Sequence, residues 1–156
     1  MLLRGPVRHQ VRVGDEHARR VGDLSEAASA LRTLAEHAQE RGETDAAETF
    51  LSQAVDASLQ VGDDLYATLT LLDLAESAQK RGDLDAAEAH LRRSLDAAHG
   101  AESSELPLCA LYRLATLALD RDDREAAKEH FRALHTASAQ IGETEMDRVA
   151  LHVLTR

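Results

Sequence analysis

The apolar residues of this chain recur with a helical spacing and then repeat at a shift of about 40 residues. One set of small and large apolar residues, spaced i, i+3, i+4 and i+7, appears three times and predicts one buried helical face in each of three segments. Its members are Leu31, Leu34, Ala35 and Ala38, then Leu71, Leu74, Ala75 and Ala78, then Leu111, Leu114, Ala115 and Ala118.

A second apolar set follows each of these helices after a short break. The breaks are Arg41-Gly42, Arg81-Gly82 and Arg121-Asp122. The second sets begin at Ala46, Ala86 and Ala126 and also superimpose at the same shift. Glycine just past a helix end and Asp at the next helix start are the usual stop and start residues. Each repeat is therefore predicted to be a pair of antiparallel helices.

The same register extends beyond both ends of the three repeats. Residues 6–21 match the second helix of a pair, and Gly22-Asp23 predicts a break after them. Residues 144–155 match a first helix without its partner. We expect a single domain over 1–156, with an orphan second helix at 6–21, three hairpin repeats at 24–63, 64–103 and 104–142, and a terminal helix at 144–155. The expected fold class is all-α, with about eight antiparallel helices: 6–21, 24–41, 44–61, 64–81, 84–99, 104–121, 124–140 and 144–155.

The pattern Leu-Ala-x-x-Ala, then Gly-Asp, then Ala-Ala-Glu resembles the tetratricopeptide repeat over residues 24–142. This sequence differs from the common pattern of that family in two features. The repeat is longer than the usual period, and the proline that usually closes the second helix is absent. The resemblance implies a right-handed α-α superhelix that binds a protein or peptide in the groove lined by its first helices. Repeats of this length also resemble sensory or regulatory segments of larger bacterial regulators, and we keep that function as an alternative.

Carrying the groove positions of the family onto this sequence predicts a peptide-binding set. It comprises Arg32, Glu36, Gln39, Leu69, Leu72, Glu76, Gln79, Cys109, Tyr112, Arg113, Thr116 and Leu119. Leu72 and Tyr112 are the expected anchors, because an apolar side chain in an open groove calls for a covering partner. The alternative is that both simply pack against neighbouring helices. Arg32 and Arg113 are the expected orienting charges.

The family's clamp for a C-terminal carboxylate is not expected here. Its first lysine and asparagine correspond to Arg32 and Glu36, and Glu36 would repel a carboxylate.

Composition narrows the class of function. The formal net charge of −10 opposes binding to nucleic acid. A lone cysteine, the absence of an apolar run of about 20 residues and a start at Met1-Leu2-Leu3-Arg4 without a signal core favour the cytoplasm and no membrane. The eight histidines do not form an i, i+4 zinc pair, and no nucleophile stands beside a base, so we expect no metal, no cofactor and no enzyme activity.

The two ends differ in charge. The opening helix is basic and the remainder is acidic, so the last helix of one copy could dock on the first helix of another and form a homo-oligomer. The alternatives are an ordinary solvated face, or a chain that is one segment of a longer repeat array.

Overall fold

The computed structural model describes residues 6–142 and 144–155, with side chains described from Glu16 onward except for Thr144. Met1–Arg4, on which the prediction of a cytoplasmic location partly rests, lie outside the described residues. Over the described part the chain forms seven α-helices and no strand. The helices are α1 (Pro6–Glu40), α2 (Thr44–Val61), α3 (Asp64–Lys80), α4 (Leu84–Gly100), α5 (Leu106–Asp120), α6 (Arg124–Ile141) and α7 (Thr144–Leu154). The all-α helical-repeat fold is thus confirmed.

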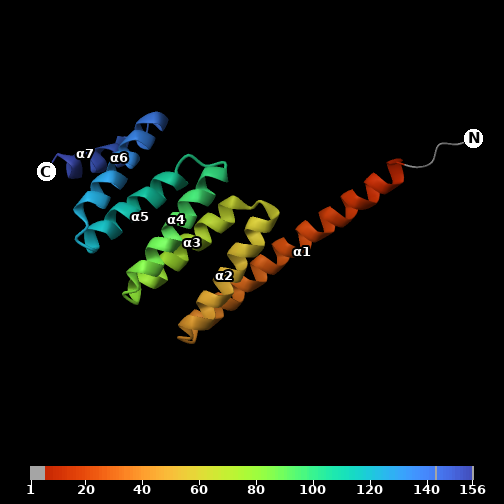
Figure 1. The fold of residues 1–156 in the computed structure, drawn as a ribbon. Coiled ribbons are helices and arrows are strands. Elements are labelled where there is room, and N and C mark those ends of the chain that lie inside the picture. The colour runs from red at the N-terminus through yellow and green to blue at the C-terminus, as the bar shows by residue number, and fades with distance from the viewer. Residues whose placement is uncertain (1–5, 143, 156) are drawn as a thin grey trace, which may run out of the picture. The chain divides into compact units, whose positions relative to one another are not determined.

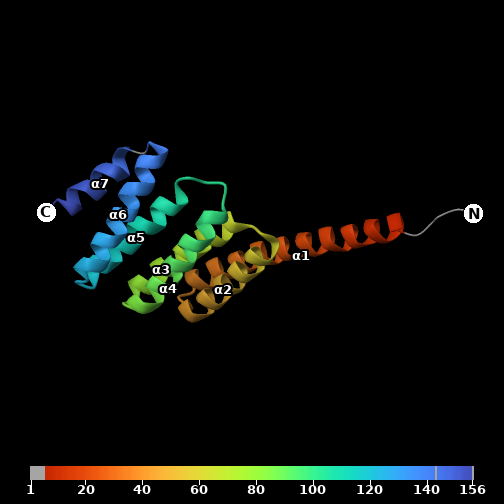
Figure 2. The same cartoon turned by 45° about the horizontal axis from the view of Figure 1, so that its top comes forward.

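The chain divides into two compact units. Unit 1 runs to Gly62 and holds α1 and α2, and unit 2 begins at Asp63 and holds α3 to α7. In unit 1 the second half of α1 packs against α2, while its first half extends past the end of α2 (Figure 1). In unit 2 each helix packs against the next along the chain (Figure 2).

The break expected after residue 21 is wrong, and it accounts for seven helices where about eight were expected. α1 continues through Gly22 as one helix of 35 residues. The same tripeptide, Val-Gly-Asp, does form a turn at 61–63, where Gly62 has φ of 73° and Asp63 caps α3. Ending a helix leaves backbone N–H and C=O groups without partners. A continuous helix keeps the backbone hydrogen bonds that a turn at Gly22 would break.

The other helix ends lie within two residues of the expected positions because their signals are local. Asp83 accepts a hydrogen bond from the backbone N–H of Ala86 at 3.0 Å, and Asp123 accepts one from Ala126 at 3.0 Å. Gly82 takes the left-handed conformation between α3 and α4. At the third break a non-glycine residue, Asp122, takes it with φ of 57°.

The recurring alanines lie where the repeat pattern requires. Ala35, Ala75 and Ala115 of the first helices are each 0% exposed. Small side chains at these positions let neighbouring helices approach closely. Leu74 and Leu114 beside the last two alanines are buried in the seam, whereas Leu34 beside Ala35 is 47% exposed. The shared buried seam inferred from the sequence is therefore confirmed.

Candidate peptide-binding face

The candidate site in unit 2 is the outer surface of the first helices α3 and α5. Its exposed apolar side chains are Leu69, Tyr112 and Leu119, and Cys109 and Thr116 are partly exposed among them. We call these five residues, together with Glu76, Gln79 and Arg113, the binding face. Residues 109, 112, 116 and 119 are spaced three or four apart, which places them along one side of α5.

The two expected anchors differ in exposure. Tyr112 is 36% exposed, whereas Leu72 is 8% exposed and packs in a cluster with Leu114 and Leu117 of α5. The alternative interpretation, packing against neighbouring helices, therefore holds for Leu72. Leu72 is not available as an anchor because α5 covers it, whereas Leu69, one turn earlier in α3, is exposed.

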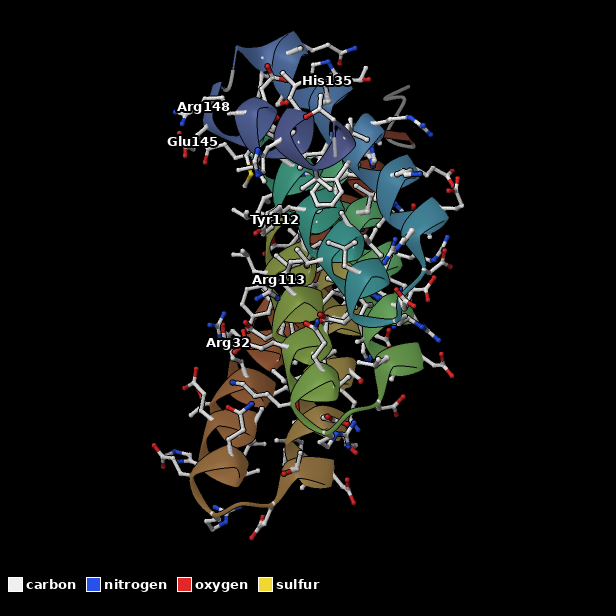
Figure 3. The ribbon with its side chains drawn as sticks, turned by 90° about the vertical axis from the view of Figure 1, so that its left-hand side faces the viewer. Arg32, Tyr112, Arg113, His135, Glu145 and Arg148 are labelled. Carbon is white, nitrogen blue, oxygen red and sulfur yellow. The ribbon has the colours of Figure 1, made fainter. Side chains whose placement is uncertain are left out.

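Arg113 joins α5 to α3 across the binding face. Its guanidinium donates to the backbone carbonyl oxygen of Leu72 at 2.9 Å and lies 3.2 Å from a carboxylate oxygen of Glu76. Tyr112 and Arg113 point to the same side of the unit, with Arg148 of α7 farther along it (Figure 3). The guanidinium has five N–H donors, so these contacts leave others for a ligand. Arg113 has a structural role beyond the orienting role expected for it.

Glu76 lies between two cations. Lys80 Nζ is 2.7 Å from its other carboxylate oxygen, one helical turn away in α3. The hydrogen bond from Lys80, followed by that from Arg113, lowers the pKa of Glu76 below its ordinary value. This carboxylate therefore stays ionised and presents a fixed negative charge beside Tyr112's helix. Lys80 is not among the residues predicted for this face, although its i+4 spacing from Glu76 is a signal for the pair.

The remaining predicted residues belong to unit 1. Arg32 Nε lies 3.4 Å from a carboxylate oxygen of Glu36, its neighbour one turn along α1, and Gln39 is exposed. The structure therefore brings Glu76 together with Arg113, and Arg32 together with Glu36.

The repeat register has one further exposed position that the predicted set leaves out. His152 of α7 is exposed and stands 40 residues after Tyr112. Applying the repeat shift once more to the terminal helix would have found it.

A separate cavity of about 220 Å³ lies between α4, α5 and α6. It is lined by Leu114, Leu117, Ala118 and Ala126, together with Glu88, Arg121, Asp123 and His130. Arg121 pairs with Asp85 and Glu88 at its rim. Burial, followed by the charge of Arg92, lowers the pKa of His130 and favours the neutral ring. None of the residues that line this cavity belongs to the predicted peptide-binding set.

Two features of the described residues bear on the expected chemistry. No three His, Cys, Asp or Glu side chains in that part of the chain lie close enough together to hold a metal ion. Likewise, none of the described helices has the length and apolar character needed to cross a membrane.

Comparison with known proteins gives one match to a family. The model of the tetratricopeptide repeat matches residues 26–98, which includes the second half of α1 and helices α2 to α4. No curated protein matches the chain. The matched segment contains the recurring alanines Ala35 and Ala75 and the breaks at Gly42 and Gly82, the same features that carried the resemblance in the sequence. Residues 26–98 therefore belong to the tetratricopeptide repeat family, by this match.

Proposed function

We propose that this chain is a non-catalytic scaffold that binds a peptide segment of another protein on the binding face of α3 and α5. Tetratricopeptide repeats generally mediate protein–protein interactions and typically act as non-catalytic scaffolds. The observation that supports this particular face is the exposure of Leu69 and Tyr112 on helices whose opposite sides are buried. Exposed apolar side chains gathered in one place favour a covering partner.

The chemistry of the face favours a peptide with both an apolar and an acidic or amide side chain. Leu69 and Tyr112 offer apolar contact, and an aromatic ring gives a large contact area at low entropic cost. The remaining donors of Arg113 suit a carbonyl, amide or carboxylate oxygen. Glu76 and Lys80 compensate one another, so shape and the apolar pair would supply most of the affinity.

Selection of binding peptides from a displayed random library, followed by calorimetry on the best sequence, tests this proposal. Leu69→Asp and Tyr112→Ala are the test variants. Leu59→Asp is the matched control, because Leu59 is 40% exposed and Leu69 is 39% exposed, but Leu59 lies on a second helix. We expect each test variant to weaken binding by at least about tenfold and the control to bind like the parent.

Equal binding by Leu69→Asp and the parent chain would contradict the proposal. A peptide that binds only with a free C-terminal carboxylate would contradict the absence of a carboxylate clamp. A cytoplasmic location and the lack of a nucleic-acid partner stay predictions.

A further inference from the structure

The middle first helix of unit 2 has two apolar sides. On one side of α5, Leu114 clusters with Ala87 and Leu91 of the preceding second helix, α4. On the other side, Leu111 clusters with Phe131 and Leu134 of its own second helix, α6. A first helix in this repeat is thus covered from both directions, and Leu114 is 2% exposed as a result.

The corresponding side of α1 is uncovered. Leu34 stands 80 residues before Leu114 in the repeat register, and it is 47% exposed. The difference arises because the described residues of unit 1 form one other helix, α2, which packs as the second helix of this pair. The described residues of unit 1 contain no preceding second helix that would cover Leu34 as α4 covers Leu114 of α5.

The first half of α1 has the sequence of such a helix. Val7, Val11 and Ala18 stand 80 residues before Ala87, Leu91 and Ala98, which are all buried in α4. Val11 is thus the register counterpart of Leu91, the residue that clusters with Leu114. The described side chains from Glu16 to Arg20 are all exposed, in keeping with a helix half that has no partner in unit 1.

Val11 and Leu34 lie on one helix and cannot meet within one chain while α1 is continuous. At 1.5 Å of rise per residue, Val11 and Leu34 of a continuous helix are about 35 Å apart. A helix half that buries no face is also marginally stable in water. A second copy of the chain can bring its residues 6–21 against Leu34, which the same copy cannot do.

We propose that two copies of this chain pair through α1. The two helices lie antiparallel and cross near Gly22, so that Val11 of each copy packs on Leu34 of the other. This is a two-fold, self-complementary contact, which closes as a dimer. It reproduces in trans the antiparallel packing of α4 against α5 (Figure 1).

Charge favours the antiparallel arrangement. Residues 6–21 have a net charge of +2, with His neutral, from Arg8, Arg12, Arg19 and Arg20 against Asp15 and Glu16. Residues 24–40 have a net charge of −2, from Glu26, Glu36 and Glu40 against Arg32. An antiparallel pair places the basic half of each helix along the acidic half of the other, whereas a parallel pair places like charges together.

This contact differs from docking of the last helix on the first. The apolar side of α7 is already used within unit 2, where Ala150 is buried in the cluster of Leu111 and Phe131. Pairing through α1 uses Leu34, which has no such cover in unit 1, and it gives a closed dimer rather than an open chain.

Light scattering of the full chain over a wide concentration range, at low salt, is the first test. We expect twice the chain mass for the parent protein and at least about tenfold weaker association for Leu34→Asp. Thr33→Asp is the matched control, because Thr33 is also exposed but lies on another side of α1, and we expect it to pair like the parent. Circular dichroism checks that both variants keep their helices.

A monomeric parent at every concentration would overturn the proposal. So would equal weakening by the two variants. Masses that grow beyond the dimer with concentration would also overturn it, because they indicate open head-to-tail chains.

Cysteine crosslinking tests the register. In a Cys109→Ser background, Val11→Cys protein is mixed with Leu34→Cys protein under mild oxidation. We expect a disulfide-linked dimer from this mixture, and none from Val11→Cys mixed with Thr33→Cys, since a disulfide forms only over a short Cβ separation. When V11C and L34C stand on one chain, an internal disulfide in the monomer would show residues 6–21 folded back at Gly22 and would overturn pairing between copies.

Discussion

Arg113 of α5 donates a hydrogen bond from its guanidinium to the backbone carbonyl oxygen of Leu72 in α3, at 2.9 Å. The same side chain pairs with Glu76, so one residue connects two successive first helices at two points. Such a contact between repeats holds the spacing of the surface on which Leu69 and Tyr112 are exposed.

Replacing Arg113 with Met should therefore lower the free energy of unfolding more than the same replacement at an exposed arginine does. The variant loses a charged hydrogen bond and a partly exposed ion pair, and we expect a loss of about 1 kcal/mol in the free energy of unfolding. Arg148→Met is the control, because its ion pair with Glu145 lies within one turn of α7 and is highly exposed. Urea denaturation of both variants measures the difference, and equal losses would refute a bridging role for Arg113.

Acid should weaken the fold partly through Glu76. Its pKa in the folded chain lies below the ordinary 4.5, first because of Lys80 and then because of Arg113. A carboxyl group with a lowered folded pKa stabilises the fold above its unfolded pKa, and this contribution is lost as the pH falls through the folded pKa. Melting temperatures from pH 6 down to pH 3 should accordingly fall less steeply for Glu76→Gln than for the parent chain. Parallel curves would argue against this carboxylate as a contributor.

The alanine seam should tolerate no larger side chain. Ala75 is fully buried between helices, so Ala75→Leu inserts atoms into a close-packed contact and should cost about 1 to 3 kcal/mol. Ala89→Leu makes the same change at an exposed position of α4, and its effect should stay within about 0.5 kcal/mol. Chemical denaturation compares the two. A stable Ala75→Leu protein with unchanged helix packing would contradict the shared seam.

Replacing Asp122, the residue with left-handed backbone conformation between α5 and α6, with glycine should stabilise the fold. Asp122 has φ of 57°, a conformation that costs a side chain energy, and its ion pair with Arg124 is highly exposed. Asp122→Gly should raise the free energy of unfolding by about 0.5 to 1 kcal/mol. The reverse control is Gly82→Ala at the equivalent break, where φ is 77° and a loss of similar size is expected. Thermal unfolding of the two variants should shift in opposite directions.

The sequence alone determined the helices from α2 to α7 and the seam between them. Helix ends follow from short-range chemistry, such as Asp83 capping α4 and Gly62 closing α2, and these contacts lie within a few residues of each other. The burial of Ala35, Ala75 and Ala115 follows from a period that a helix pair must share. The helix ends depend only on nearby residues, whereas the burial of the alanines also needs a neighbouring helix, which the repeat pattern predicts.

The tertiary structure decided the features that depend on what lies beside a helix. Val-Gly-Asp forms a turn at 61–63 but continues a helix at 21–23, so these three residues are compatible with both conformations and the tripeptide alone does not decide between them. Leu72 and Tyr112 hold equivalent positions, yet the leucine is covered by Leu114 and Leu117 while the tyrosine stays exposed. Leu34 and Leu114 differ in the same way. Periodicity states which side of a helix is apolar, whereas exposure depends on whether another helix is present to cover that side.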